Sequence, residues 1–166
     1  MNKPAVFLDR DGVLNFDKSY VYKISDFEWI DGSREAIKFL KDENYLVFVV
    51  TNQSGITRGF YSEKDVEKLH KFINRDLLKM KTEIDDFFYS PYHPDVPNKK
   101  YDHLMNLRKP NTGMLEIAEK KWMFDKKKTF MIGDKKTDVE CATNYGIKGF
   151  QFKDGNLLEF VKNIIC

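Results

Sequence analysis

Short apolar runs alternate with longer segments of helical periodicity along this chain, and this alternation limits the folds open to it more than any other feature. Five runs have the length and composition of β-strands: Ala5–Leu8, Tyr45–Val50, Asp86–Tyr89, Thr129–Ile132 and Gly149–Phe152. Apolar residues recur at intervals of three and four in four further segments: Ser33–Glu43, Ser62–Met80, Thr112–Phe124 and Thr137–Tyr145. Strands that alternate with helices predict an α/β fold, in which a central parallel sheet carries helices on both faces.

Cap residues indicate where two of the predicted helices begin, and two stretches without periodicity indicate long loops. Ser62 with Asp65 is typical of a helix start, and Asn111 and Thr112 supply cap residues for the next helix. The longest stretch without periodicity, from residue 90 to residue 109, is interrupted by prolines, and long loops in compact domains are usually functional or disordered. A second irregular stretch, from residue 15 to residue 31, carries aromatic side chains that either line the mouth of a site or cover the core: Tyr20, Tyr22, Phe27 and Trp29.

Length and composition predict one ordinary domain. The chain has 166 residues, enough to bury a sizeable core, and we expect a single domain over residues 1–166. The formal net charge of +2 gives no reason to expect a nucleic-acid partner. Cys141 and Cys166 are too far apart for a thiolate metal motif, and no apolar run approaches the length of a membrane helix. We therefore expect a cytoplasmic, monomeric protein with no membrane association.

Polar residues follow the predicted strands. Asp9 and Asp11 come directly after the first strand, and two carboxylates so close require a cation or a shared proton to offset their repulsion. Thr51 follows the second strand and opens a Ser- and Gly-containing turn whose amides can hold phosphate oxygens. Asp134 follows the fourth strand. Because parallel sheets bind ligands at the carboxyl ends of their strands, these groups predict one site.

Two more groups complete the pattern. Arg108 and Lys109 are adjacent cations before a predicted helix, and Asp138 lies one helical turn after Asp134. Each of these short patterns is common on ordinary protein surfaces, so none predicts a function alone. Their order along the chain is the informative feature.

In that order, the chain resembles the haloacid dehalogenase superfamily of aspartate-nucleophile phosphatases, whose four motifs span Asp9 to Asp138 here. Several segments are similar to the D-glycero-D-manno-heptose 1,7-bisphosphate 7-phosphatase branch of that superfamily, and less so to the related histidinol-phosphatases: residues 9–15, 17–21, 27–32, 51–59 and 108–110. The resemblance implies a three-layer, Rossmann-like fold. The intervals between the motifs are too short for an inserted cap domain, so we expect an open site.

The resemblance also implies roles for individual residues. Asp9 is expected to attack phosphorus and form an aspartyl-phosphate, while Asp11 protonates the leaving oxygen and later activates water. Thr51 and Lys109 are expected to bind the transferring phosphoryl group. Mg²⁺ is expected on the Asp9 carboxylate, the Asp11 backbone carbonyl and Asp134, with Asp138 orienting this shell.

Other residues are expected to bind the remainder of the substrate. Arg108 and Lys135 are candidates for a second phosphate or sugar hydroxyls. The adjacent candidates are Asp17, Lys18, Ser19, Tyr20, Asn52, Gln53 and Ser54. The predicted reaction is Mg²⁺-dependent hydrolysis of the 7-phosphate of D-glycero-D-manno-heptose 1,7-bisphosphate, in the synthesis of nucleotide-activated heptose for lipopolysaccharide or capsule.

Three alternatives to this reaction are consistent with parts of the sequence. Histidinol-phosphate hydrolysis uses the same chemistry, and the preferred anomer at carbon 1 stays open. Removal of 3′-phosphates from nucleic acid is disfavoured by the near-neutral charge. A non-catalytic phosphosugar-binding module has no need of a nucleophile beside an acid, so Asp9 and Asp11 argue against it.

The chain departs from the family pattern in the third loop, where many relatives hold a structural zinc. The four matching positions carry no zinc ligand, so we predict no structural zinc: Ser90, Tyr92, Met105 and Leu107. His93 and His103, with Asp95 or Asp102, could form a replacement site, but surface or packing roles are the expected reading. The loop is then expected to be held by packing of Tyr92, Tyr101, Leu104, Met105 and Leu107.

Overall fold

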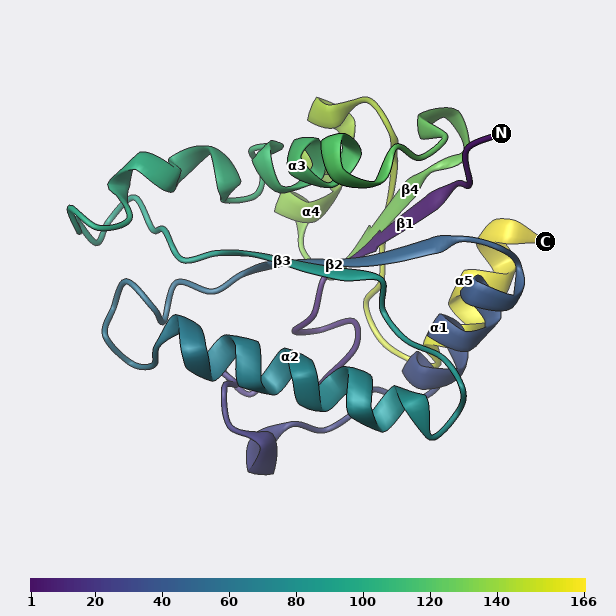
Figure 1. Ribbon diagram of the computed structural model, residues 1–166, viewed down its shortest axis with the longest axis horizontal. Helices are drawn as coiled ribbons and strands as arrows, with labels where there is room; N and C mark the ends of the chain where they lie inside the picture. The colour runs from purple at the N-terminus through teal and green to yellow at the C-terminus, as the bar shows by residue number, and fades with distance from the viewer.

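A five-stranded, wholly parallel sheet forms the centre of the computed structural model, which describes residues 1–166 (Figure 1). Its strand order is β3-β2-β1-β4-β5. The strands are β1 (Ala5–Leu8), β2 (Leu46–Asn52), β3 (Asp86–Ser90), β4 (Phe130–Gly133) and β5 (Lys148–Gln151). The predicted α/β fold with a central parallel sheet is confirmed.

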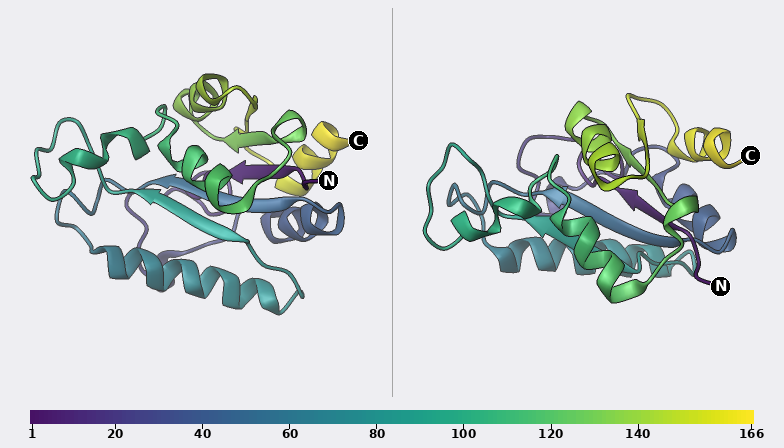
Figure 2. Two further views of the ribbon diagram at one scale, coloured as in Figure 1. Left: turned by 45° about the horizontal axis from the view of Figure 1, so that its top comes forward. Right: turned by 90° about the horizontal axis from the view of Figure 1, so that it is seen from above.

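Helices cover both faces of this sheet (Figure 2). The α-helices are α1 (Ser33–Asp42), α2 (Glu63–Leu78), α3 (Gly113–Trp122), α4 (Lys136–Tyr145) and α5 (Leu157–Ile165). Three short 3₁₀ helices lie in the connections: η1 (Ile24–Asp26), η2 (Asp102–Leu107) and η3 (Lys126–Lys128). No helix is both long enough and apolar enough to cross a membrane.

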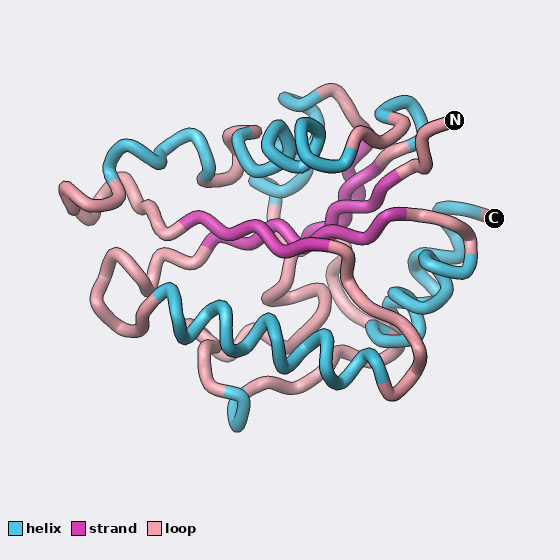
Figure 3. Tube along the Cα trace, in the orientation of Figure 1, coloured by secondary structure: helices cyan, strands magenta, loops and turns pink.

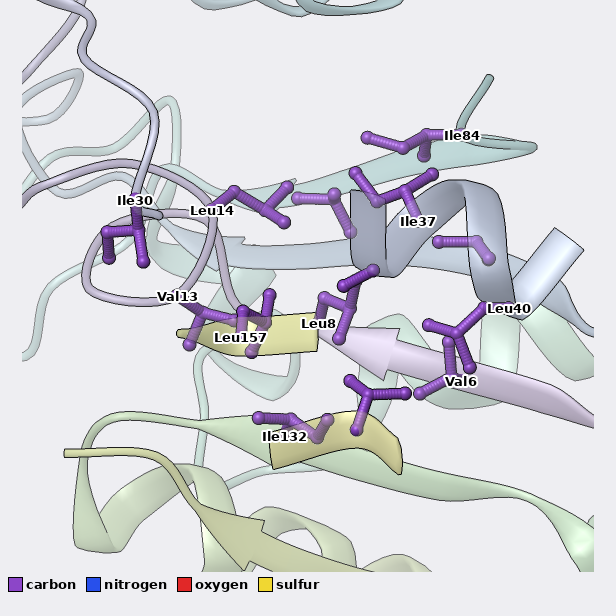
Figure 4. Packing of buried hydrophobic residues seen from close by; sticks show 14 of the residues in the cluster. Val6, Leu8, Val13, Leu14, Ile30, Ile37, Leu40, Ile84, Ile132 and Leu157 are labelled. Atoms are coloured by element: carbon purple, nitrogen blue, oxygen red, sulfur yellow. The ribbon is translucent and has the colours of Figure 1, made fainter. Parts of the chain in front are cut away.

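Alternation along β1 divides the core into two layers. Val6 and Leu8 belong to a cluster of 20 buried residues that also draws side chains from α1, α2 and α5. Ala5 and Phe7 belong to a second cluster of 12, shared with α3 and α4. Successive strand residues point to opposite faces, which explains why β1 contributes to both clusters. Figure 4 shows Val6 and Leu8 among side chains of the first cluster, including Ile37 from α1.

The predicted strands and four predicted helices are present, with ends shifted by no more than two residues. The Ser62 hydroxyl accepts a hydrogen bond from the Asp65 amide (3.2 Å), and the Asp65 carboxylate accepts one from the Ser62 amide (2.8 Å), which confirms the predicted helix start. Thr112 lies at the N-cap of α3, but its hydroxyl donates to Glu116 instead of capping the helix (2.6 Å).

Three details of the prediction were wrong. Helix α5 was not predicted; it begins after Asn156, whose side chain accepts a hydrogen bond from the Glu159 amide (3.2 Å). Thr51 lies inside β2 and not after it, because the ladder to β3 continues to Asn52. The connection from residue 90 to residue 109 contains η2 and is not wholly irregular.

Topology places the loops together. In the sheet, β2 lies on one side of β1 and β4 lies on the other, so the strand order reverses beside β1. Loops gather at the carboxyl ends of the strands, at the end of the sheet opposite the two chain termini (Figure 3). This is the position at which parallel sheets bind ligands.

Candidate active site

Asp9 is held rigidly at the carboxyl end of β1. Its amide continues the sheet by donating to the Ile132 carbonyl (3.0 Å), and its Oδ1 accepts a hydrogen bond from the Arg10 amide (2.8 Å). The side chain is buried and lines a cavity of about 360 Å³. Burial raises the pKa of Asp9 well above its usual value, opposed by Lys109 and reinforced by three neighbouring carboxylates. A cation beside this carboxyl therefore favours its charged form.

Lys109 supplies one positive charge to this group. Its buried Nζ lies 3.0 Å from Asp9 Oδ1 and 2.6 Å from Asp138 Oδ1, and it donates to the Val50 carbonyl (2.8 Å). Burial alone lowers the pKa of Lys109, but the two carboxylates raise it above the usual value. The Asn52 amide fixes the backbone by accepting from Lys109 N (3.0 Å) and donating to Lys109 O (3.2 Å). Lys109 is thus a fixed, charged donor at the site.

Asp134 provides an oxygen that no protein group satisfies. The carboxylate oxygens of Asp9, Asp134 and Asp138 lie within 4.8 Å of one another. Asp138 already accepts from Lys109 Nζ and from the Lys135 amide (3.0 Å), whereas buried Asp134 Oδ1 has no hydrogen-bond partner. Burial raises the pKa of Asp134, as it does for Asp9. Hard carboxylate oxygens in this arrangement fit Mg²⁺.

Gly12 allows the loop after β1 to approach Asp134. Its φ is +88°, and a Cβ built on it would lie 2.3 Å from Asp134 Oδ2. A larger residue would clash with the carboxylate and strain the backbone. The close approach of the two loops thus depends on this glycine.

Asp11 faces the same cavity and is held by three donors. Asn15 Nδ2 donates to Oδ1 (2.9 Å), Gln53 Nε2 donates to Oδ2 (3.0 Å), and the Arg10 guanidinium lies 3.1 Å from Oδ1. These contacts fix the orientation of a carboxylate two residues from Asp9. The predicted pair of aspartates is therefore brought to one cavity.

Thr51 is set back from the cavity. Its side chain is 1% exposed and does not line the cavity, and its hydroxyl accepts a hydrogen bond from Gln53 Nε2 (2.8 Å). Gln53 Oε1 in turn accepts from the Tyr61 hydroxyl (2.5 Å). Burial raises the pKa of Tyr61 to about 12, so this hydroxyl stays protonated at neutral pH. Gln53 thus connects Thr51 and Asp11 through one fixed amide.

Most predicted site residues line the cavity. Those that do are Asp9, Asp11, Asp17, Ser19, Tyr20, Asn52, Gln53, Ser54, Arg108, Lys109 and Lys135. Thr51 and Asp134 do not, and neither does Lys18, whose Nζ pairs with Glu28 at the surface (2.8 Å). The sequence prediction placed Lys18 at the site because its neighbours are there, but its side chain points elsewhere.

The aromatic side chains of the loop after β1 divide between the two roles considered for them. Tyr20 lines the cavity, with its ring 4.9 Å from that of Phe60. Tyr22 stacks on Tyr61 at 4.9 Å, and Phe27 and Trp29 pack against the larger core cluster. Only Tyr20 is at the mouth of the site.

Four residues that line the cavity had not been identified as site residues: Arg58, Tyr61, His93 and Thr137. Two of them line the cavity together with Arg108 in a group that we call the distal cluster, which consists of two guanidinium groups and one imidazole (Arg58, Arg108 and His93). Burial and the charge of Arg58 lower the pKa of Arg108, and burial followed by the two guanidinium groups lowers the pKa of His93. Arg58 Nε is buried without a partner. Arg58 lies in segment 51–59, which carries the family resemblance, so the sequence did contain a signal that could have identified it as a site residue.

The third loop is held partly as predicted. Tyr101 and Leu104 pack with Ile56 and Val66, and Leu107 packs against the second core cluster. Met105, however, is 58% exposed, so its predicted packing role was wrong. A short 3₁₀ helix turns this side chain outward.

Two further residues of the third loop, Tyr92 and His93, make polar contacts near the cavity. The Tyr92 carbonyl accepts a hydrogen bond from Arg108 (3.3 Å). His93 Nδ1 accepts one from the Asp95 amide (3.1 Å), and its ring lines the cavity. His93 thus lines the cavity, so the surface or packing role predicted for it was wrong.

Comparisons with known proteins agree with this geometry. Residues 106–158 match the HAD-hydrolase-like family model. The chain is 39% identical to the D-glycero-beta-D-manno-heptose-1,7-bisphosphate 7-phosphatase of Rhodopseudomonas palustris, over 98% of this chain and 91% of that protein. It is 37% identical to the D-glycero-alpha-D-manno-heptose-1,7-bisphosphate 7-phosphatase of Campylobacter jejuni, over 99% and 93%.

A solved structure shows the same fold. The D,D-heptose 1,7-bisphosphate phosphatase of B. bronchiseptica, complexed with magnesium and phosphate, superposes with a TM-score of 0.81 at 27% identity. The match covers 96% of this chain and 86% of that one. Sequence and structural similarity thus extend over nearly the whole molecule.

Proposed function

Because this chain belongs to the heptose 1,7-bisphosphate 7-phosphatase family of the haloacid dehalogenase superfamily, we propose that it hydrolyses the 7-phosphate of a D-glycero-D-manno-heptose 1,7-bisphosphate. The observation that carries this proposal is the pairing of two sites in one cavity. Asp9 and Lys109 lie at one end, and the distal cluster supplies uncompensated positive charge for a second phosphate.

The proposed reaction proceeds in two steps. An Asp9 carboxylate oxygen bonds to phosphorus while the bond from phosphorus to the sugar oxygen breaks, and Asp11 gives a proton to that oxygen. Water then attacks the aspartyl-phosphate and gives a proton to Asp11, which releases phosphate and restores Asp9. Both carboxyls are in place for these steps, since both line the cavity.

We propose that Mg²⁺ binds to the Asp9 carboxylate, the Asp11 backbone carbonyl and Asp134. Buried Asp134 Oδ1, which has no protein partner, supports this assignment, as does the magnesium complex of the B. bronchiseptica phosphatase. When bound, the ion neutralises charge between the anionic nucleophile and the anionic phosphate. Asp138 instead holds Lys109 and is a positioning residue.

We propose that Lys109 and Thr51 contact the transferring phosphoryl oxygens. Lys109 Nζ lies beside Asp9 and stays charged, so it offers a preorganised donor where negative charge develops. The Thr51 hydroxyl lies behind Gln53, which supports a contact only if substrate displaces the Gln53 amide.

The other end of the cavity is assigned to the second phosphate and the sugar. Two guanidinium groups suit a phosphate because each can donate two parallel hydrogen bonds. The proposed sugar contacts are Asp17, Ser19, Tyr20, Asn52, Gln53, Ser54 and Lys135. Histidinol phosphate fits this end poorly, because its ammonium group would meet the cations Arg58 and Arg108.

Phosphate release tests the proposal directly. The α and β anomers of the bisphosphate and histidinol phosphate are each incubated with the protein, with and without Mg²⁺. We expect release of one phosphate per bisphosphate, dependent on the metal, and a much lower kcat/KM for histidinol phosphate. Preference for histidinol phosphate would contradict the substrate, and no release from any of the three would contradict the reaction.

The remaining expectations are kept as proposals. We propose a single domain over residues 1–166, a monomeric state, no structural zinc and no nucleic-acid partner. A cytoplasmic location, in a pathway to lipopolysaccharide or capsule heptose, is supported by two free cysteines, one of them exposed. Gel filtration with light scattering tests the monomeric state, and metal analysis of the purified protein tests the absence of a structural zinc.

A further inference from the structure

Arg10 lies between the two motif aspartates, and the reaction as described makes no use of it. Its side chain is 0% exposed and does not line the cavity. A buried guanidinium is costly unless its donors are satisfied, so its partners carry information about its role. Those partners are Asp11 next to it, the Val21 carbonyl farther along the loop after β1, and His70 on α2.

The contact with Asp11 constrains the carboxylate. Arg10 Nη2 lies 3.1 Å from Asp11 Oδ1 and 3.2 Å from Oδ2, and Nε lies 3.4 Å from Oδ1. A planar guanidinium that contacts both oxygens limits rotation of the carboxylate. The same Nη2 donates to the Val21 carbonyl (2.5 Å), which ties the loop of Asp17, Ser19 and Tyr20 to Asp11.

His70 on α2 holds the other side of the guanidinium. Its Nε2 lies 3.2 Å from Arg10 Nη1, and because arginine has no acceptor, this nitrogen must accept the bond. Burial and the charge of Arg10 lower the pKa of His70 well below its usual value, which keeps the ring neutral. The ring stacks on Phe87 of β3 at 4.5 Å, so the acceptor is fixed in place.

We propose that Arg10 and His70 are positioning residues for Asp11: Arg10 acts by direct contact, and His70 acts through Arg10. The inference rests on the proposed function, because the orientation of the Asp11 carboxyl matters only if this group transfers a proton to the leaving oxygen. The requirement for that proton grows with the basicity of the leaving group. A nitrophenolate departs without a proton, whereas the alkoxide of a sugar or of glycerol does not.

Two substitutions at position 70 separate positioning from packing. H70L and H70Q both remove the ring that stacks on Phe87, but only glutamine keeps an acceptor for Arg10. For each variant, kcat/KM is measured with 4-nitrophenyl phosphate, phenyl phosphate and glycerol 2-phosphate. This parameter is used because it reports steps up to the first phosphoryl transfer and excludes hydrolysis of the aspartyl-phosphate.

We expect H70L to lower kcat/KM about tenfold for glycerol 2-phosphate and less than about twofold for 4-nitrophenyl phosphate, with phenyl phosphate between them. H70Q is expected to recover most of the loss on glycerol 2-phosphate. The control I73A removes core packing from the same helix without removing a partner of Arg10, so it should lower the melting temperature and leave the substrate ratio unchanged.

Equal losses on all three esters in H70L, or identical behaviour of H70L and H70Q, would overturn the inference and leave His70 a packing residue. The three esters contain no heptose, so the outcome does not depend on the natural substrate. If the wild-type protein cleaves these esters but not the heptose bisphosphate, the proposed substrate is wrong. The comparison of leaving groups would still decide the role of His70 in that case.

Discussion

Two groups of charged residues that line the cavity, one around Lys109 and the other the distal cluster, differ in whether their charges are paired within the protein. At the catalytic end, Lys109 Nζ lies between Asp9 and Asp138, so the cation and both carboxylates are paired within the protein. In the distal cluster, the charge of Arg58 lowers the pKa values of both Arg108 and His93, and the Asp95 carboxylate, 4.0 Å from His93 Nδ1, is exposed. The carboxylates of Asp9 and Asp138 therefore have a buried cation of the protein beside them, whereas the two guanidinium groups of the distal cluster have an exposed carboxylate near them. If Asp9 is the nucleophile and the distal cluster binds the second phosphate, as we propose, the two groups of residues should respond differently to substitution.

The nucleophile gives the largest expected effect. D9N keeps the shape of the side chain but removes its ability to attack phosphorus, so we expect kcat to fall by about 10⁴-fold or more. Removal of one of several crowded carboxylates should leave the melting temperature unchanged or raise it slightly. Phosphate release and thermal melting measured on the same sample check both points, and an active D9N protein would rule out covalent catalysis by Asp9.

Lys109 should combine catalytic and structural losses. K109M leaves Asp138 buried without its cation, so we expect a loss of about 3–5 kcal/mol in the free energy of unfolding and a fall in kcat of about 10²–10³-fold. The double variant K109M/D138N removes both charges and should recover part of the stability but none of the activity. Urea unfolding and steady-state kinetics measure the two effects. Stability equal to wild type in K109M would show that this end does not depend on internal pairing.

Magnesium should stabilise the catalytic end in a pH-dependent way. Burial raises the pKa of Asp9 and of Asp134, so the folded, metal-free protein holds protons more tightly than the unfolded chain. That contribution to stability is present at acid pH, below the ordinary aspartate pKa, and is lost as the pH rises through the raised values. Mg²⁺ replaces those protons, and at 100 times its Kd it should add about 2.7 kcal/mol at neutral pH.

Thermal melting with and without Mg²⁺, at neutral and at acid pH, tests the magnesium prediction. The increase in melting temperature should be larger at neutral pH, where no proton competes with the metal. The control D134N should lose most of this increase, because it removes the oxygen that has no protein partner. An equal increase at both pH values would mean that the metal binds elsewhere.

The distal cluster should give the smallest effect and one confined to recognition. R58Q is expected to lower kcat/KM for the bisphosphate about tenfold, roughly 1.4 kcal/mol, mainly through KM. It should leave kcat/KM for a heptose 7-phosphate nearly unchanged, since that ester has no second phosphate. The matched control K18Q alters a surface cation outside the cavity and should affect neither substrate. Equal losses on both esters in R58Q would place Arg58 outside the second-phosphate subsite.

Sequence patterns predicted most of the fold, and the failures have local causes. β1 was predicted to the residue because its four residues are apolar and the turn-forming Asp9–Gly12 segment follows directly. Helix α5 was missed although Asn156 is a cap residue and apolar residues recur at intervals of three and four from Leu157 to Ile165. Met105 was assigned to packing because methionine is usually buried, but the turn of η2 directs it outward.

Predictions for the site failed where side-chain direction mattered. Lys18 and Thr51 lie beside cavity residues in the chain, yet one points to Glu28 and the other lies behind Gln53. Arg58 and His93 reach the cavity from separate loops, and no spacing rule connects them to Arg108. The cavity position of a side chain on a loop depends on contacts with residues distant in sequence.

The amino-acid sequence by itself determined the α/β class, the layered core and the identity of the paired aspartates, because these follow from the periodicity of apolar residues and from short motifs at strand ends. Only the tertiary structure decided which cations are already paired and which are free, because that depends on distances between residues up to about a hundred positions apart, such as Lys109 and Asp9. It also decided that buried Arg10 connects Asp11 with His70, a contact between groups 60 residues apart. The pairing of charges in a buried site depends on tertiary packing, so it cannot be predicted from a short sequence motif.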